Sequence, residues 1–133
     1  MILVDSNVLI DVLTQDMTWR AWSEAALMNA ADRDDVAINP IIYAEIASGL
    51  ATMADLDRSL GAGAFRRLAL PYEAGFVAGR AFVEYRRRGG VRTSPLPDFY
   101  IDAHAAVAGL RLPTRDPRRY RGYFPQVSLL CPG

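Results

Sequence analysis

The first seven residues constrain the fold more than any other stretch of this chain. Met1–Val4 is an uninterrupted apolar run that ends in the carboxylate of Asp5, and a second apolar run, Val8–Ile10, follows after Ser6 and Asn7. Short runs of β-branched and aliphatic residues bounded by polar ones predict strands that are buried on both faces, as in a parallel sheet. Asp5 is then expected at the carboxyl end of the first strand, where open α/β sheets bind their ligands.

The rest of the chain alternates helical patterns with short apolar runs. Further strands are predicted at residues 36–38, 67–70, 110–113 and 127–130, with helices between them. This alternation predicts an α/β fold, a three-layer α/β/α sandwich with a mostly parallel five-stranded sheet. In the strand order 3-2-1-4-5, strands one and four flank the point where the winding reverses, and a crevice opens there. At 133 residues, without a repeat or an internal boundary, residues 1–133 are expected to form a single domain.

The longest helical pattern covers residues 72–88. Six residues share one face of this helix at helical spacing: Tyr72, Gly75, Phe76, Gly79, Phe82 and Val83. The two glycines, four residues apart, are expected to be sites of close helix packing.

Composition excludes several classes of protein. The hydrophobic fraction of 51% is too high for a disordered chain. No apolar stretch reaches the roughly 18 residues of a membrane span. Asp5 and Asp11 interrupt the first apolar region, which therefore does not read as a signal peptide. The only cysteine, Cys131, has no partner for an internal disulfide, so we expect a cytoplasmic protein without a membrane segment.

The charges are balanced overall but unevenly placed. Residues 1–65 hold ten acids and three arginines, whereas residues 66–133 hold five acids and twelve arginines, and there is no lysine. Guanidinium groups make bidentate contacts with phosphates, so the second half of the chain is suited to bind nucleic acid. A bias in base composition that favours arginine over lysine is an alternative explanation for the missing lysine, but it explains the asymmetry less well.

Four acids lie shortly after a predicted strand or at the start of the helix that leads into one. They are Asp5, Glu45, Asp98 and Asp116. Each alone has an ordinary explanation: Asp5 and Asp116 could be helix N-caps, Asp98 could favour the positive end of a helix, and Glu45 could face water. Together, however, all four belong to the same rim of the predicted sheet.

Carboxylates gathered in one crevice repel each other, and a hard divalent cation removes that cost. Oxygen ligands from several carboxylates suit Mg²⁺ or Mn²⁺. Such ions activate water and stabilise the oxygens of a phosphodiester displacement, so the chemistry needs no Ser, Cys or His nucleophile. The chain offers no convincing nucleophile of that kind, and we predict that it cleaves RNA with the help of a metal.

Four other residues lie close to these acids in the sequence. Asp102 falls one helical turn after Asp98 and is either a fifth metal ligand or a solvated helix acid. Asn7 and Thr114, each two residues from a candidate acid, are expected to hydrogen-bond to the ligands, or else to the local backbone. His104, displaced around the same helix, is expected to have a packing role.

Four segments in order resemble the PIN-domain ribonucleases, specifically the VapC-like toxins of bacterial toxin–antitoxin pairs. The segments are residues 2–10, 39–45, 97–103 and 114–120, and they extend over almost the whole chain. The resemblance implies the PIN sandwich, with Asp5, Glu45, Asp98 and Asp116 as the metal-binding acids. It also implies an endoribonuclease that depends on Mg²⁺ or Mn²⁺, forms a homodimer and is silenced by a cognate antitoxin protein.

Two positions depart from the family pattern. Asp102 stands where relatives often carry alanine, which puts the metal geometry in doubt. Pro113 falls in a predicted central strand, where proline should be rare, so that strand is expected to be short or bulged.

Two arginine clusters flank the candidate acids and are expected to hold RNA phosphates. The residues predicted to bind RNA are Arg86, Arg87, Arg88, Arg92, Arg115 and Arg118. The alternatives are a solvated helix end for the first cluster and core packing beside the aromatic residues for the second.

Two other functions compete with the nuclease. A non-catalytic RNA-binding or regulatory module would keep the fold without turnover, but the intact set of four acids argues against it. A haloacid-dehalogenase-like phosphatase also begins with a strand that ends in aspartate, but it needs a second acid two residues later, where this chain has Asn7. The RNA target, the antitoxin and the number of metal ions are not evident from the sequence.

Overall fold

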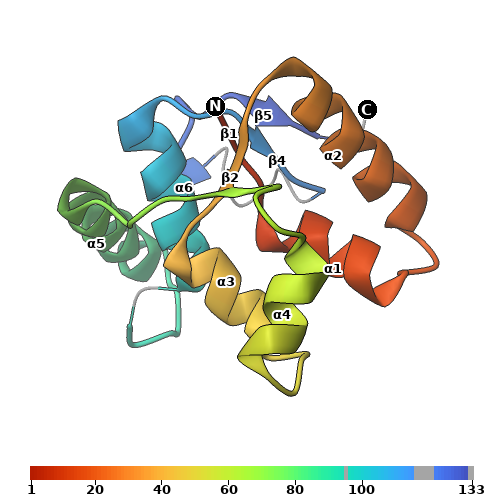
Figure 1. The fold of residues 1–133 in the computed structure, drawn as a ribbon. Coiled ribbons are helices and arrows are strands. Elements are labelled where there is room, and N and C mark those ends of the chain that lie inside the picture. Colours follow the sequence, from red (N-terminus) through yellow and green to blue (C-terminus); the bar gives the residue numbers. More distant parts are fainter. Residues whose placement is uncertain (95, 116–121, 132–133) are drawn as a thin grey trace.

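The computed structural model describes residues 1–94, 96–115 and 122–131. In chain order its elements are β1 (Ile2–Leu3), α1 (Ser6–Thr14), α2 (Arg20–Arg33), β2 (Val36–Ile38), α3 (Pro40–Ala47), α4 (Met53–Leu60), β3 (Arg66–Arg67), α5 (Tyr72–Arg87), α6 (Pro97–Ala108), β4 (Leu112–Pro113) and β5 (Leu129–Leu130). The helices lie on both sides of the short central strands, with α5 and α6 on one side and α1 and α2 on the other (Figure 1). The predicted α/β class is confirmed.

All the strand pairs are parallel. β2 lies between β1 and β3, with Ile2 opposite Val36 and Ala37 opposite Arg66. A second, two-stranded sheet pairs β4 with β5, and a single bridge between Ile2 and Arg111 connects β1 to the start of β4. The described residues therefore form sheets of three and two strands, and the predicted continuous five-stranded sheet and three-layer arrangement are not confirmed.

Pro113 explains where the two sheets separate. The amide of Leu3 donates to the carbonyl of Arg111 at 3.0 Å, which is one rung between β1 and β4. In a parallel ladder the next rung comes from the residue two positions later, Pro113, which has no N–H to donate. On the other edge of β4, the amides of Leu112 and Thr114 still donate to the β5 region. The proline thus stops pairing on one side only.

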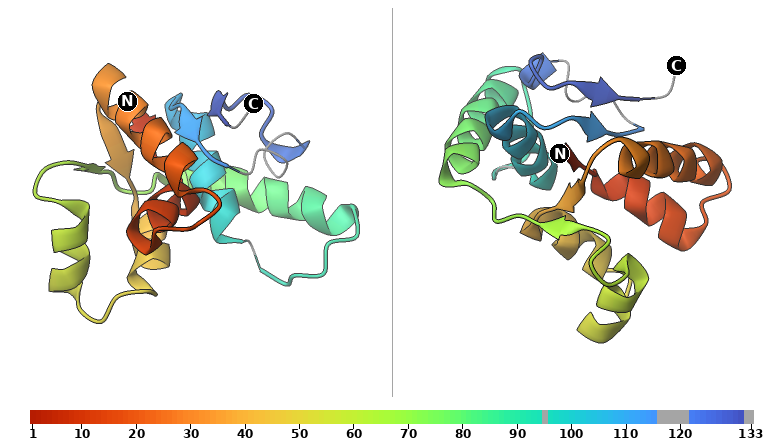
Figure 2. Two further views of the ribbon diagram at one scale, coloured as in Figure 1. Left: turned by 90° about the vertical axis from the view of Figure 1, so that its right-hand side faces the viewer. Right: turned by 45° about the horizontal axis from the view of Figure 1, so that its top comes forward.

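The core lies around the central strands. Ile2, Leu3 and Val4 are fully buried, as are Ile42 of α3 and Ile101 of α6. β4 contacts β1 and α2 and follows directly after α6, which brings distant segments of the chain together beside β1 (Figure 2). The carboxyl end of β1 is therefore surrounded by helices and by the segment after β4.

Helix α5 buries a face of alanines rather than the face that carries Tyr72 and Phe76. Ala74, Ala78 and Ala81 are buried against the molecule, whereas Tyr72 and Phe76 are 99% and 71% exposed. A Cβ atom at Gly75 or Gly79 would meet no described atom within 4 Å, so these glycines are not sites of close packing. The predicted close packing at the glycines was wrong, and of the predicted face Phe82 packs against the core, because small residues let α5 approach α6 closely.

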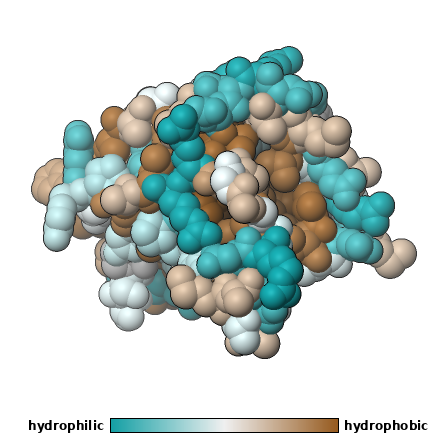
Figure 3. All heavy atoms as spheres, viewed as in Figure 1, coloured by the Kyte–Doolittle hydropathy of each residue, from teal (hydrophilic) through white to brown (hydrophobic). Residues whose placement is uncertain are grey.

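The polar and apolar surfaces are interleaved. In the view of Figure 3, hydrophobic residues reach the surface in the middle of the molecule, below the hydrophilic residues of α2. A groove of about 380 Å³ lies between α2 and β5 and is lined by Trp22, Ala26, Leu129 and Cys131, among others. Among the residues that the structure describes, no helix has the length and apolar composition needed to cross a bilayer.

Candidate active site

Asp5 is a fully buried carboxylate at the point where β1 ends and α1 begins. It occupies the N-cap position of α1 with extended backbone angles, but its side chain makes no capping hydrogen bond. Its Oδ2 atom instead accepts hydrogen bonds from Asn7 Nδ2 at 3.2 Å and from Thr114 Oγ1 at 3.0 Å. The alternative explanation of Asp5 as a simple helix cap is therefore wrong. Side chains from α1 and from the segment after β4 hold the buried carboxylate instead.

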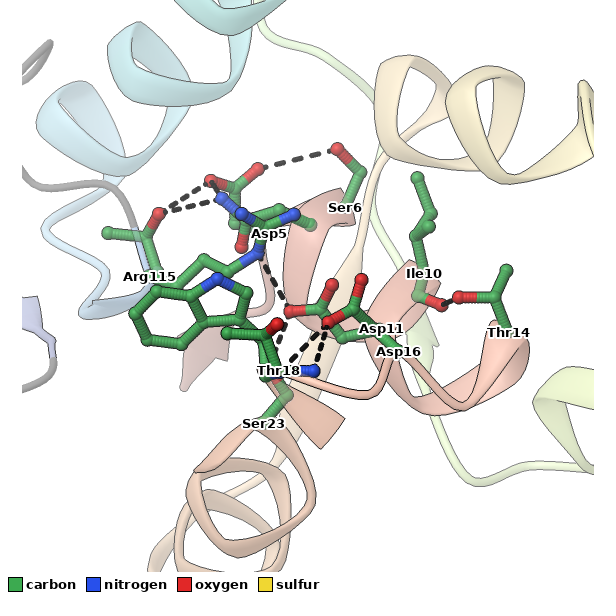
Figure 4. Close-up of polar contacts among 12 residues, drawn as sticks. Asp5, Ser6, Ile10, Asp11, Thr14, Asp16, Thr18, Ser23 and Arg115 are labelled. Carbon is green, nitrogen blue, oxygen red and sulfur yellow. Dashed lines mark hydrogen bonds and ion pairs between the residues drawn. The ribbon is translucent and has the colours of Figure 1, made fainter. Parts of the chain in front are cut away.

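Ser6 connects Asp5 to the second candidate acid. Its hydroxyl donates to Glu45 Oε1 at 2.9 Å and lies 3.5 Å from Asp5 Oδ1. Figure 4 shows the carboxylate of Asp5 and the hydroxyl of Ser6 facing each other at the start of α1. Two acids that are forty residues apart in the sequence thus share one hydroxyl. Sequence reasoning did not select Ser6, although its place between Asp5 and Asn7 was the available signal.

Asn7 and Thr114 complete this polar group. Thr114 follows β4 directly and is fully buried, and its hydroxyl also accepts a hydrogen bond from Asn7 Nδ2 at 3.0 Å. The Oδ1 atom of Asn7 is buried and has no hydrogen-bond donor among the described residues. The backbone amide of Thr114 donates to Leu130, so β4 and β5 fix the position of its hydroxyl. The structure places both predicted hydrogen-bonding residues beside Asp5.

The two acids of α6 lie in different surroundings. Asp98 is in the first turn of the helix and is partly exposed, whereas Asp102, one turn later, is fully buried. The alternative that Asp102 is a solvated helix acid is therefore wrong. Asp116 and Arg118 lie outside the described residues.

The described residues alone do not assemble a complete metal site. Within residues 1–94, 96–115 and 122–131, no three His, Cys, Asp or Glu side chains are close enough to hold a metal ion together. The structure therefore brings Asp5 and Glu45 to one hydroxyl, and the meeting of Asp98 with this pair stays a prediction.

The donor atoms that do converge are all oxygens. The carboxylates of Asp5 and Glu45 carry like charges beside a single hydroxyl proton, and the buried Oδ1 of Asn7 adds a further oxygen nearby. Hard cations such as Mg²⁺ prefer oxygen ligands, and a cation offsets the repulsion between neighbouring carboxylates. The chemistry of this group therefore fits Mg²⁺ or Mn²⁺ better than a metal that prefers sulfur or imidazole ligands.

Asn39 and His104 connect α3, which carries Glu45, to α6, which carries Asp98 and Asp102. Asn39 caps α3 as predicted, because its Oδ1 accepts from the amide of Ile42 at 2.9 Å. Its Nδ2 atom consequently faces Nδ1 of His104 at 3.0 Å, so this ring nitrogen must be unprotonated to accept the bond. Burial lowers the pKa of His104 below its usual value of 6.5.

We expect His104 to make the stability of the protein depend on pH. Because the folded state lowers the pKa of His104, the unfolded chain binds the proton more readily, and stability is lost as the pH falls below 6.5. Urea unfolding at pH 7.5 and 5.5 should give a larger loss for the wild-type chain than for His104→Gln, which keeps a polar group but does not titrate. Equal losses in the two proteins would contradict this prediction.

The first predicted RNA-binding cluster lies at the end of α5. Arg86 donates to the carbonyls of Gly90 and Arg92 at 3.1 and 3.0 Å, and it thereby closes the turn after the helix. Arg88 pairs with Glu84 at 3.0 Å and lies 4.7 Å from the centre of the Tyr123 ring. These two arginines have structural roles that were not predicted. Contact of the cluster with RNA stays a prediction.

Arg115 belongs to a partly buried ion pair that the sequence did not suggest. Its Nε donates to Oδ2 of Asp11 at 2.8 Å, and Asp11, in α1, is only 1% exposed. The signal for Asp11 was an acid three residues after Val8, on the same face of an apolar helix. Whether Arg115 also contacts RNA is not decided by this pair.

Comparisons with known proteins agree with this fold. The family model for the PIN domain matches residues 2–125. No curated protein matches the sequence.

Solved structures with a similar fold include two complexes that cover nearly the whole chain. A structure of VapBC2 from Rickettsia felis bound to a DNA fragment from its promoter aligns with a TM-score of 0.73 at 17% identity and covers 100% of both chains. A toxin–antitoxin complex from Klebsiella pneumoniae aligns with a TM-score of 0.71 at 24% identity and covers 96% of this chain and 95% of that chain.

A third similar structure is FitAcB from Neisseria gonorrhoeae. It aligns with a TM-score of 0.69 at 22% identity and covers 98% of this chain and 96% of that one. At these identities the likeness concerns the fold, and it agrees with the family match. The resemblance stated from the four sequence segments is confirmed, and the chain belongs to the PIN domain family.

Proposed function

We propose that this chain is a metal-dependent endoribonuclease that acts as the toxin of a toxin–antitoxin pair, with residues 1–133 forming one nuclease domain. The observation that supports this most strongly is the buried carboxylate of Asp5, which caps no helix and shares the hydroxyl of Ser6 with Glu45. Burying a carboxylate is costly, and the cost is offset when the group coordinates a metal.

The predicted metal ligands are carboxylates from four parts of the chain: Asp5, Glu45, Asp98, Asp102 and Asp116. When bound, Mg²⁺ or Mn²⁺ would supply positive charge that activates water and offsets the charge of the RNA phosphate. Asn7 and Thr114 hold one oxygen of Asp5, which leaves the other oxygen facing Ser6 and Glu45. Ser6 holds Glu45 through its Oε1 atom, so the side chain of Glu45 is kept beside Asp5.

The finer features of the fold are also proposed on this basis. The bridge between Ile2 and Arg111 places β4 next to β1, which supports the order 3-2-1-4-5 and a sandwich with helices on both sides. In that order Asp5 and Thr114 follow neighbouring strands, and their hydrogen bond is what such neighbours would make.

The proposed partners are an RNA substrate, a cognate antitoxin protein and a second copy of this chain in a homodimer. The structures with the same fold are described as toxin–antitoxin and VapBC complexes, which supports the antitoxin. The proposed location is the cytoplasm, where both RNA and an antitoxin would be available.

Removal of the metal should abolish cleavage. Purified protein is incubated with labelled single-stranded RNA in Mg²⁺, in EDTA, and in EDTA followed by excess Mn²⁺. Cleavage is expected in the first and third conditions only, because the carboxylates cannot act on a phosphate without a cation to offset its charge. Melting curves in Mg²⁺ and EDTA are the control that the protein stays folded. Cleavage that persists in EDTA would overturn the metal-dependent mechanism.

A second candidate is a non-catalytic RNA-binding or regulatory module with the same fold. Such a module would bind RNA through the same arginines without turnover. The same assay separates the two functions, because a binding module would retain RNA on a filter without cleaving it in any metal.

A further inference from the structure

Arg115 is fixed on one edge of its guanidinium group. Nε donates to Oδ2 of Asp11 at 2.8 Å, and the guanidinium carbon lies 5.7 Å from the centre of the Trp19 ring. The carboxylate of Asp11 also accepts a hydrogen bond from Ser23 Oγ at 2.8 Å. Both α1 and the start of α2 therefore fix the position of this arginine, and Figure 4 shows its Nε directed at the carboxylate of Asp11.

The other edge of the guanidinium group has no hydrogen-bond partner among the described residues. Among the described residues, Arg115 makes a hydrogen bond through Nε alone, and its side chain is 33% exposed. A guanidinium group has five N–H donors in a rigid plane, so its two terminal amino groups remain available to an outside acceptor.

Arg115 directly follows a residue of the candidate active site. The residue directly before it, Thr114, donates a hydrogen bond to Asp5 at 3.0 Å. The segment is thus attached to α1 twice in succession, by Thr114 at the first turn and by Arg115 at Asp11 in the next. The guanidinium group of Arg115 is therefore held beside α1 directly after the residue that contacts Asp5.

We propose that Arg115 binds the RNA phosphate next to the cleaved bond, and that Asp11 and Trp19 are positioning residues that orient its guanidinium group. This inference rests on the proposed nuclease function and assigns one substrate contact within it. The planar pair of terminal amino groups matches two oxygens of a phosphate. Asp11 acts through Arg115 and does not touch the RNA.

Two variants and a matched control test this assignment. Arg115→Gln removes the charge and the donors, and Asp11→Asn keeps the arginine but weakens its anchor. Arg66→Gln is the control, because Arg66 also forms a single Nε bond with an acid, Asp35, at 2.9 Å on the exposed β3 strand. Binding of a labelled single-stranded RNA is measured in EDTA over a range of salt concentrations, and KM and kcat are measured in Mg²⁺.

Arg115→Gln should raise KM about tenfold and lower the slope of log K against log salt by about 0.7, the value for one phosphate contact with a single strand. Asp11→Asn should raise KM while leaving the salt slope near that of the wild-type protein, because the positive charge is still present. Arg66→Gln should alter neither quantity. A purely structural ion pair would lower the melting temperature in both Asp11 and Arg115 variants without changing the salt slope in either.

An unchanged salt slope in Arg115→Gln would overturn the assignment. If that variant does not fold, Arg115→Lys gives the second test, because it keeps the charge but loses the planar pair of donors. It should retain the salt slope and still raise KM, and a KM equal to that of the wild-type protein would count against the proposal. Since binding is measured in EDTA, its result is independent of cleavage. A wild-type protein that never cleaves RNA but loses one phosphate contact in Arg115→Gln would refute the nuclease and leave the phosphate site standing.

Discussion

Replacement of Asp5 by asparagine is expected to reduce RNA cleavage about 100-fold or more while the protein stays folded. The amide has nearly the same shape as the carboxylate, but it lacks the charge that a cation requires. Its remaining oxygen can accept the hydrogen bonds that Asn7 and Thr114 donate to Oδ2 of Asp5, so the NH₂ group replaces the oxygen that faces Ser6 and can no longer bind a cation. Loss of one electrostatic group at a reacting centre commonly costs this much in rate.

The stability of this variant should not fall with its activity. Asp5 and Glu45 are like charges that both lie within 3.5 Å of the hydroxyl of Ser6, so neutralising one of them relieves repulsion. We expect a melting temperature equal to or above that of the wild-type protein when no metal is added. Sites that are built for function often show this trade of stability against activity.

Ser6→Ala and Asp35→Asn provide graded controls for the same assay. Ser6→Ala removes the hydroxyl that holds Glu45, and supporting residues of this kind typically change activity by about 10- to 100-fold. Asp35→Asn removes an exposed acid that pairs with Arg66 and should leave cleavage unchanged. If Asp5→Asn and Asp35→Asn cleave RNA equally well, the group around Asp5 is not the catalytic site.

The contact that the structure shows between Asp5 and Thr114 follows from the geometry of parallel strands. Residues that follow neighbouring parallel strands meet at one edge, so Asp5 after β1 and Thr114 after β4 come within 3.0 Å of each other. The start of α3 was predictable for a local reason, since Asn39 caps the helix and Pro40 occupies its first turn. Both inferences need only the pattern of the chain near each residue.

The features that were missed depend on contacts between distant residues. The ion pair of Asp11 with Arg115 joins positions far apart in the sequence, and neither residue is unusual in its own segment. Pro113 indicated from the sequence that its strand would be short or bulged. Which edge of β4 the proline interrupts depends on the direction in which its nitrogen points. Hydrophobic spacing cannot supply that direction.

Helix α5 shows how residue size can override hydrophobicity. Two faces of this helix are apolar in the sequence, one with Tyr72 and Phe76 and the other with Ala74, Ala78 and Ala81. The alanine face is buried because α5 packs closely on α6, where Tyr85 meets the edge of Phe99 at 5.8 Å between ring centres. Larger side chains at the alanine positions would hold the two helices apart.

Because of this packing, we expect adding an apolar side chain at Ala78 to destabilise the protein more than removing one at Phe76. Hydrophobicity alone would give the opposite order. Ala78→Leu adds a large apolar side chain at a fully buried position and should lower the free energy of unfolding by about 1–3 kcal/mol, because the core has no room for it. Phe76→Ser removes a large apolar side chain that is 71% exposed and should change it by no more than about 0.5 kcal/mol. Urea unfolding of both variants at two protein concentrations measures these values and separates any effect on self-association. A larger loss for Phe76→Ser than for Ala78→Leu, at both concentrations, would mean that the aromatic face of α5 contributes to the core of the single chain.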